Sequence, residues 1–367
     1  MWNCYLNNRS DLLLTNNITT NNLPLNFNFM KRIAFLMGIA ALAFASCAKD
    51  TVKETNPGLA IDFRVATQTR ALETTTASLN NFYVTAVYAE YAEGAEGNPG
   101  NYIPESVYFE KVQFVKEGNY FSSTPAYYWP NDGQLNFIAY APEMTGVAFT
   151  HATQTLSDFK PAKEFEDQVD FIVAKNTGSK ANVETGVALT FDHMLSQIEI
   201  KAKNTHEGYN YQVAGVRIAG VHGQADFDFA TNTWTYDDVK AEYDTLYTTT
   251  PIALDNEGVN IMCKKTIEVD GESVEVSDNA MLLPQDLSAA GMEAKFGVYV
   301  KVTSASTGSQ VFPSSGNYDW MEVAVTTNWE AGYKYVYTLD MSQADELGTP
   351  IKFTLDKVTP MGEGAIE

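Results

Sequence analysis

The sequence predicts an all-β protein made of two β-sandwich domains. Apolar residues alternate with polar ones through most of the chain after residue 58, and turn-forming residues separate the alternating runs. The 3.6-residue apolar spacing of an amphipathic helix is scarce. With 367 residues, of which 45% are hydrophobic, the chain is long enough for two domains of ordinary size.

The alternating segments follow one another along the chain. The first, LAIDFRVA, places Leu59, Ile61, Phe63 and Val65 on one face. Further strands are expected in YFEKVQFV, QLNFIAYAP, QVDFIVAK, VALTFDHMLSQIEIKAK, YQVAGVRIAGV, ADFDFATNTWTY, KFGVYVKVTS, WMEVAVTTN and YKYVYTLDM. The breaks AEGAEGNPGN, WPNDGQ and NTHEGYN carry Gly, Pro, Asn or Asp, which favour turns. A polar stretch, NTGSKANVETG, precedes the second half, so we place the two domains at 71–188 and 189–350.

Residues 30–46 have the order of a secretory signal. The basic pair Lys31 and Arg32 precedes an apolar run that ends in small residues. That run is too short for a membrane-spanning helix, which needs about 20 residues. Because Cys47 follows Phe-Ala-Ser directly, the site resembles a bacterial lipobox, in which this cysteine is acylated. The alternative is a short buried helix.

Residues 1–29 are rich in Asn and have no periodicity, so we expect them to be an upstream extension, with Met30 as the natural start.

Composition limits the partners of this chain. It carries 46 Asp and Glu against 24 Lys and Arg, a formal net charge of −22, which repels nucleic-acid phosphates. Of its three cysteines, Cys4 lies in the expected extension and Cys47 is expected to carry lipid. This leaves Cys263 alone, so no internal disulfide is expected; it is interpreted as a packed thiol, with a reactive thiol beside Lys264 and Lys265 as the alternative.

Catalytic and metal-binding patterns are missing from the sequence. G-x-S-x-G, H-E-x-x-H and a Gly-rich phosphate loop do not occur, and the four histidines have no metal-ligand spacing. Asp192, His193 and Ser196 share one predicted strand, in which neighbours point to opposite faces. Asp226 and Asp228 are not followed by the glycine and glutamate of a calcium loop. We therefore predict a protein without enzymatic activity, catalytic residues, cofactor or metal.

An ordered set of segments resembles the fimbrillin family of type V pilus subunits. The segments are YYWPNDGQLNFIAYAP, VDFIVAKN, VALTFDHMLSQIEIKAKN, MLLPQ and NWEAGYKYVYTLDM, and the resemblance covers nearly all of residues 56–355. It implies two tandem transthyretin-like β-sandwich domains. It also implies export as a lipoprotein to the outer membrane of a Gram-negative cell and assembly with other fimbrial subunits into surface fimbriae that adhere to a host or bacterial receptor.

The resemblance also implies proteolytic maturation by an arginine-specific protease. The matching position is TQTRALETT, so the expected cleavage lies between Arg70 and Ala71. Cleavage would remove residues 47–70, a lipidated pro-segment that includes the first strand. The sheet edges left behind would be templates for another strand. In family members that remain uncleaved as anchors or tips, Arg70 is only a solvated loop residue.

The carboxyl-terminal segment 351–367 is the candidate replacement strand. It sets Ile351, Phe353 and Leu355 in the same alternating order as the apolar residues of the first strand. A tail with this pattern would fill the vacated groove of a neighbouring subunit. The alternative is an ordinary last strand of its own domain. A rival function of another class is a surface glycan-binding lipoprotein that uses aromatic faces, although alternating aromatic residues are more often core.

Overall fold

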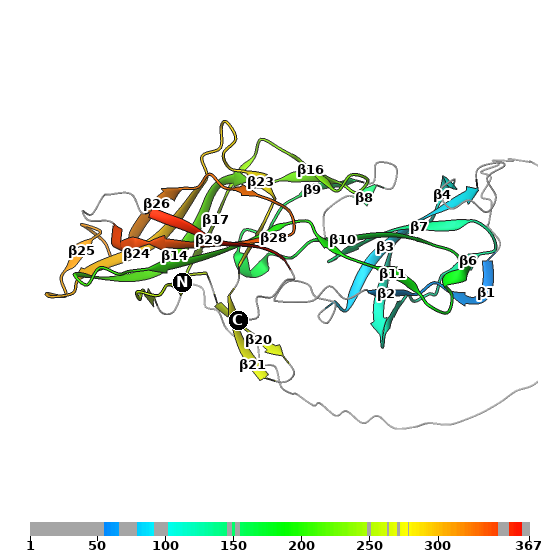
Figure 1. Cartoon of the computed structure of the whole chain (residues 1–367), viewed down its shortest axis with the longest axis horizontal. Helices are drawn as coiled ribbons and strands as arrows, with labels where there is room; N and C mark the ends of the chain where they lie inside the picture. The colour runs from blue at the N-terminus through cyan, green and yellow to red at the C-terminus, as the bar shows by residue number, and fades with distance from the viewer. Residues whose placement is uncertain are drawn as a thin grey trace, which may run out of the picture. The chain divides into compact units, whose positions relative to one another are not determined.

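The computed structural model describes residues 55–65, 79–91, 102–144, 149–150, 155–247, 251–262, 264–269, 272–277, 279–343 and 352–361. Strands are the main regular elements of these parts of the chain, which contain no α-helix, and Figure 1 shows them in chain order from blue to red. The all-β prediction is confirmed, and the sheets are arranged as sandwiches. Among the described residues no helix has the length and apolar character needed to cross a membrane.

The first half of the chain forms an eight-stranded sheet. Its strand order is β11 (Val187–Leu189), β2 (Phe63–Val65), β5 (Tyr120–Ser122), β4 (Tyr102–Glu117), β3 (Asn81–Tyr91), β7 (Gln134–Ala141), β10 (Ile172–Gly178) and β12 (Asp192–His193). A separate ribbon pairs β1 (Thr55–Ala60) with β6 (Tyr128–Pro130). The expected first strand is therefore two short strands, which pair with different partners.

One face of this sheet holds the first hydrophobic core, which is rich in aromatic residues. Its fully buried large side chains include Phe63, Phe82, Phe114, Phe137 and Trp129. The turn between β6 and β7 requires glycine at position 133, because Gly133 adopts φ +71° and any Cβ there would lie 2.7 Å from the carbonyl oxygen of Ala89.

The second half of the chain forms a sandwich of two larger sheets. The five-stranded sheet has the order β19 (Val259–Asn260), β13 (Ser196–Lys203), β28 (Tyr333–Asp340) and β29 (Lys352–Pro360), with β22 (Ala280–Leu282) also paired to β13. The six-stranded sheet has the order β17 (Lys240–Leu246), β14 (Tyr209–His222), β24 (Lys295–Ser304) and β25 (Gln310–Phe312), with β18 (Ile252–Ala253) on β14 and β26 (Asp319–Ala324) on β24. Alternate residues of β13, β28, β14 and β24 fill the core between them.

A four-stranded sheet combines strands from both halves of the chain. Its order is β16 (Thr233–Tyr236), β15 (Ala225–Asp228), β9 (Thr155–Phe159) and β8 (Phe149–Thr150). Strand β9 lies within the range expected for the first domain, yet it pairs with β15 from the second half. The division at residue 188 stays a prediction.

A third hydrophobic cluster, which we call the junction cluster, packs this sheet against the outer face of β3, β7 and β10. Its members include Tyr83, Ile138, Tyr140, Phe159, Phe171, Val173, Phe227, Phe229 and Met361, with Trp234 packed against them. Most of β7 and the first three residues of β10, Ile172 to Ala174, are thus buried on both faces, which explains why apolar residues follow one another there instead of alternating with polar ones.

Small elements complete the described structure. Two ribbons pair β20 (Lys264–Val269) with β21 (Glu272–Ser277) and β23 (Gln285–Asp286) with β27 (Asn328–Trp329). Three single-turn 3₁₀ helices are η1 (Phe165–Asp167), η2 (Lys180–Asn182) and η3 (Met341–Gln343). Ser179 caps η2 by accepting a hydrogen bond from the Ala181 amide.

The junction cluster yields a stability prediction. Phe227 is fully buried, and its ring centroid lies 5.3 Å from Phe171 and 4.8 Å from Trp234. Because Phe227→Ala leaves a cavity, we expect the free energy of unfolding to fall by about 3–5 kcal/mol, measured by urea titration with tryptophan fluorescence. Thr235→Ala, at an exposed site on the neighbouring strand, should change it by less than about 0.5 kcal/mol. Equal effects of the two substitutions would contradict this packing.

Candidate functional site

The amino-terminal strands lie in a groove of the first half, and this groove is the candidate functional site. Strand β1 pairs irregularly with β6, and the amide of Ile61 donates to the carbonyl of Tyr127 at 2.8 Å. Strand β2 then pairs in parallel with β11 and meets β5 at Phe63 and Phe121. The segment is therefore inserted between other strands of the first half.

Ile61 and Phe63 supply side chains to the first core. Ile61 is 1% exposed and Phe63 is 0% exposed. The Phe63 ring lies edge-on to Phe114 at 4.8 Å, to Phe137 at 4.9 Å and to Phe82 at 5.9 Å between centroids. Such edge-to-face contacts are favourable beyond the area they bury. Without this segment the groove would keep three aromatic walls around a space the size of a phenyl ring.

The outer face of the same segment is polar. The Asp62 carbonyl accepts a hydrogen bond from the Val187 amide at 2.9 Å, while the side chain of Arg64 is exposed. Burial, and next the neighbouring Glu117 carboxylate, raises the pKa of Asp62 above its ordinary value. The first strand thus has a well-packed inner face, whereas partial burial of Asp62 on the outer face disfavours its charged form.

Several predicted residues lie outside the described residues: Cys47, Arg70, Ala71, Cys263 and Ile351. For Leu59 in β1 and Phe353 in β29 the structure describes only the strand to which each belongs. Their assigned roles in lipidation, cleavage and strand exchange stay predictions.

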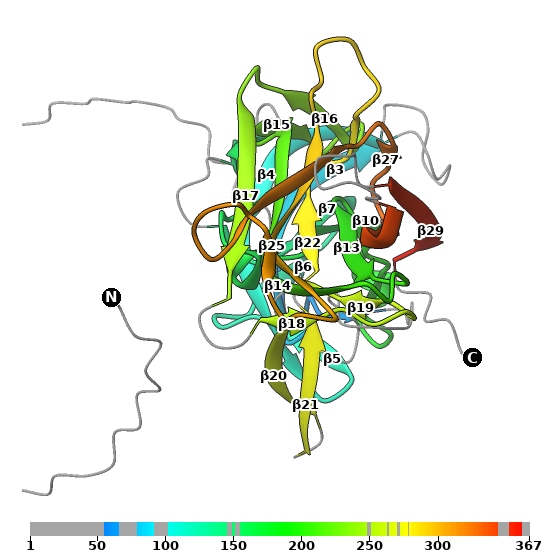
Figure 2. The ribbon, with the colours of Figure 1, turned by 90° about the vertical axis from the view of Figure 1, so that its left-hand side faces the viewer.

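The carboxyl-terminal strand β29 lies at the edge of the five-stranded sheet, where Figure 2 shows it in dark red. It pairs antiparallel with β28 from Tyr333 opposite Pro360 to Asp340 opposite Lys352. In this structure the tail therefore has the place of a last strand of its own sheet, as in the alternative considered for it above.

Two apolar residues of β29, Leu355 and Val358, are only partly buried in this position. Leu355 lies opposite Tyr337 and Val358 opposite Tyr335, and both tyrosines are buried in the second core. Opposed residues of an antiparallel pair share a face. Leu355 is nevertheless 37% exposed and Val358 is 44% exposed. Their exposure indicates that the opposing sheet does not cover this edge.

Polar and terminal contacts hold β29 in place. The Thr338 hydroxyl donates to Asp356, and the Thr354 hydroxyl donates to the other oxygen of that carboxylate at 2.7 Å. At the end of the strand the Met361 amide donates to the Gly332 carbonyl at 2.6 Å, and the Met361 side chain joins the junction cluster.

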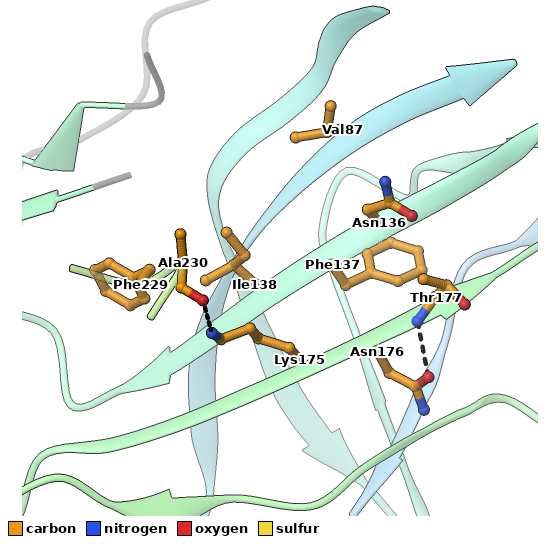
Figure 3. Close-up of a pocket in the computed structure, with 9 residues that line it drawn as sticks. All are labelled: Val87, Asn136, Phe137, Ile138, Lys175, Asn176, Thr177, Phe229 and Ala230. Atoms are coloured by element: carbon orange, nitrogen blue, oxygen red, sulfur yellow. Dashed lines mark hydrogen bonds between the residues drawn. The ribbon is translucent and has the colours of Figure 1, made fainter. Parts of the chain in front are cut away.

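A separate depression of about 390 Å³ lies on the outer face of the first sheet (Figure 3). Val87, Ile138 and Phe229 provide its apolar lining. Asn136, Asn176 and Thr177 lie at the opposite end from Phe229 and Ala230. An apolar depression with a few polar groups at its rim is the usual form of a small-ligand site.

Lys175 is the cation of this depression. Its Nζ donates to the Ala230 carbonyl at 3.3 Å. Burial lowers the pKa of Lys175 below its ordinary value, and the carboxylates of Asp228 and Asp192 oppose that effect. Sequence analysis missed this depression, because its lining residues come from segments far apart in the chain.

The polar residues considered as catalytic candidates make structural contacts. His193 Nδ1 lies 2.8 Å from Asp170 Oδ2, whereas the Ser196 hydroxyl donates to the Glu330 carbonyl at 2.8 Å. Asp226 accepts from the Asp158 amide. Within the described residues, no group of three or more His, Cys, Asp or Glu side chains is arranged to hold a metal ion.

Comparisons with known proteins agree with the resemblance seen in the sequence. A family model described as fimbrillin-like matches residues 69–357. The fimbrium subunit Fim1C of Phocaeicola vulgatus is 26% identical over 234 residues, which are 55% of this chain and 61% of that protein. The chain thus matches less than two thirds of that relative.

A solved structure has the same fold. The crystal structure of a fimbrial protein from Bacteroides vulgatus superposes with a TM-score of 0.53 at 19% identity, covering 82% of this chain and 99% of that chain. At this identity the likeness shows shared architecture alone. The family model, by contrast, spans well over half of the sequence, and the chain belongs to the fimbrillin-like family.

Proposed function

We propose that this chain is a structural subunit of a type V pilus that polymerises by protease-triggered donor-strand exchange and supports adhesion. The observation that carries the proposal is the burial of Phe63. A short strand near the start of the chain completes the first core, so its removal would create a binding groove for another strand. Family membership supports the same function.

The proposed maturation begins with a lipidated precursor. Cys47 carries lipid and tethers the exported chain to the outer membrane. Hydrolysis of the bond between Arg70 and Ala71 by an arginine-specific protease then frees residues 47–70, which contain β1 and β2. Loss of this segment leaves unpaired backbone groups on β5, β6 and β11, and such open edges bind added strands.

The proposed donor is segment 351–367 of a second subunit. In the donated strand, Ile351 and Phe353 take the positions of Ile61 and Phe63, and Leu355 takes that of Val65. The exposure of Leu355 on β29 supports this role, because this side chain gives up little apolar burial when it leaves the sheet edge. The tail and the groove are different surfaces of the subunit. Each subunit can therefore bind one neighbour through its tail and another through its groove, so that subunits add head to tail into a filament.

An uncleaved anchor or tip subunit is the rival within the same fold. In that case residues 47–70 stay in place and the lipid persists. Amino-terminal sequencing of protein sheared from cells distinguishes the two, because the mature subunit begins at Ala71 and the anchor at Cys47.

Cleavage should trigger assembly. Treating the purified precursor with an arginine-specific protease should convert monomers into a ladder of oligomers on native gels, with Ala71 as the new amino terminus. Arg70→Gln should remain monomeric, whereas Arg64→Gln, a matched change at the neighbouring arginine, should assemble normally. Oligomers formed by Arg70→Gln, or a cleaved wild type that remains monomeric, would contradict the proposal.

A subunit should need its carboxyl-terminal tail to insert into a neighbour's groove, but not to receive the tail of another subunit in its own groove. Phe353→Ser combined with Leu355→Ser should keep the fold, judged by circular dichroism, and abolish elongation after cleavage. Because this variant still has an acceptor groove, a small fraction of it mixed with wild type should shorten fibres in electron micrographs. The control combines Thr354→Ser with Thr359→Ser, at an exposed and a half-buried position of the same strand. Fibres of normal length in the mixture would argue against donation by the tail.

A second role, recognition of an acidic surface glycan, is supported by the depression at Lys175. The Lys175 ammonium is suited to a sugar carboxylate, the Asn136 and Asn176 amides to hydroxyl or acetamido groups, and the apolar lining to a sugar face. This site would serve adhesion and leave the assembly groove untouched.

A glycan array tests this role. The intact chain should bind carboxylate-bearing glycans, and Lys175→Ala should weaken that binding about tenfold, because a charged hydrogen bond is lost. Lys163→Ala, which removes the same charge beside Asp244, should bind like wild type. Absence of glycan binding, or equal binding by both variants, would exclude the depression as the glycan site.

A further inference from the structure

Three aromatic side chains form a continuous strip on the outer face of the six-stranded sheet. Tyr299 of β24 lies opposite Trp320 of β26, with 5.1 Å between their ring centroids. The ring of Tyr318, which directly precedes β26, lies 5.6 Å from that of Tyr299. All three rings are partly exposed. The neighbours of Tyr299 in β24, Val298 and Val300, are buried in the second core, so this aromatic strip faces away from that core.

Trp320 lies close against the backbone of β24. A Cβ atom at Gly297 would lie 3.1 Å from the indole Cε3 atom, so glycine at this position leaves the room that the ring occupies. The guanidinium carbon of Arg217 lies 4.0 Å from the indole ring centroid, which is a cation–π contact. The position of the indole is therefore fixed by its neighbours.

Charged side chains beside the aromatic strip pair with one another. Arg217 Nε lies 3.2 Å from Glu242 Oε1. The terminal nitrogens of Arg217 lie 3.7 Å from Asp244 and 3.8 Å from Glu322, and Lys295 Nζ lies 3.3 Å from the second oxygen of Glu322. A charged ligand would compete with these pairs, whereas a neutral ligand would leave them intact. The strip therefore favours a neutral ligand.

Polar side chains flank the strip on the side away from Arg217. Lys301 follows Tyr299 by two residues in β24, so it points to the same face of the sheet. It lies opposite Gln212 of β14. An ammonium group and an amide can both form hydrogen bonds with hydroxyl groups. The aromatic rings thus lie between two rows of polar side chains.

A sugar chain fits this arrangement better than a protein partner does. Pyranose rings present apolar C–H faces and hydroxyl edges, so they can stack on aromatic rings while their hydroxyls bond polar neighbours. A stable protein interface buries about 800 Å² on each partner. Three aromatic side chains bury roughly 150–250 Å² each when completely covered, and these three are already partly covered, so the strip is too small for such an interface.

The spacing and tilt of the rings indicate a single polysaccharide chain. Centroid distances of 5.1 and 5.6 Å are close to the length of one sugar residue, so neighbouring sugars of one chain can each contact a ring. The rings are tilted to one another by 34° and 41°. Such a tilt can be followed by a flexible chain, whereas a flat crystalline surface cannot contact all three rings.

We propose that the aromatic strip is a binding site for a single chain of a neutral polysaccharide. Tyr299 and Tyr318 stack on neighbouring sugars, the exposed part of Trp320 contacts a third, and the flanking polar groups bond the sugar hydroxyls. The site differs from the depression at Lys175 in its sheet and in the charge of its ligand. It does not depend on strand exchange, because β24 and β26 take no part in that step.

Affinity electrophoresis of the intact chain tests this proposal. A soluble β-linked glucan, a glucomannan and a galactomannan are each cast into a native gel, and at least one of them should retard the wild type. Tyr299→Ala and Tyr318→Ala should each weaken this binding about tenfold, because one stacked ring is lost. Tyr299→Phe should bind within about twofold of wild type, because it keeps the ring.

Two control variants and a change of salt accompany the test. Tyr236→Ala removes an exposed ring outside the strip, and Lys175→Ala changes the depression; both should bind like wild type. Raising the salt concentration to about 0.5 M should leave the binding unchanged, because a neutral ligand has no charge to screen. Circular dichroism checks the fold of each variant, and if Tyr299→Ala is unfolded, Tyr318→Ala decides the test.

Three results would overturn the proposal. The first is a wild type that none of the polysaccharides retards, or that they retard no more than the folded alanine variants of the strip. The second is loss of wild-type binding at high salt, which would exclude a neutral ligand. The third is a wild type that sediments as a dimer and becomes monomeric with Tyr299→Ala, because the strip would then be a contact between two copies. These measurements use uncleaved protein, so their failure leaves the proposed strand exchange untouched.

Discussion

The contact of Phe63 with Phe82, Phe114 and Phe137 is the interaction on which the first half of this protein depends. The three walls come from β3, β4 and β7, whereas Phe63 comes from a three-residue strand near the start of the chain. Because Phe63 belongs to a separate short strand, that strand could leave the core as a unit. The burial that stabilises this structure would then define the shape of the groove left by its removal.

The junction cluster supports the groove wall from the opposite face of the first sheet. The junction cluster covers the outer face of β3, β7 and β10 with residues from the second half, including Phe227 and Phe229. These strands are thus packed on both faces, so residues other than those of the amino-terminal strand also hold the wall in place. A preorganised wall lowers the conformational cost of binding a new strand.

The two ends of the chain differ in how firmly they are held. Ile61 and Phe63 are almost completely buried, whereas Leu355 and Val358 of β29 remain partly exposed at a sheet edge. Backbone pairing with β28 is the main attachment of the tail in this structure. In the proposed exchange, pairing in a neighbour's groove would replace those bonds and bury Leu355 more fully than the sheet edge does.

Alternation in segments such as LAIDFRVA was enough to predict an all-β protein and the inward face of Ile61 and Phe63, because side-chain direction in a strand depends only on local geometry. The similar order of apolar residues around Phe353 was also evident from the sequence. The pairing partners of the strands could not be predicted, because they depend on contacts between residues far apart in the sequence. Only the tertiary structure split the first strand between β6 and β11, joined β9 to β15 and assembled the depression around Lys175.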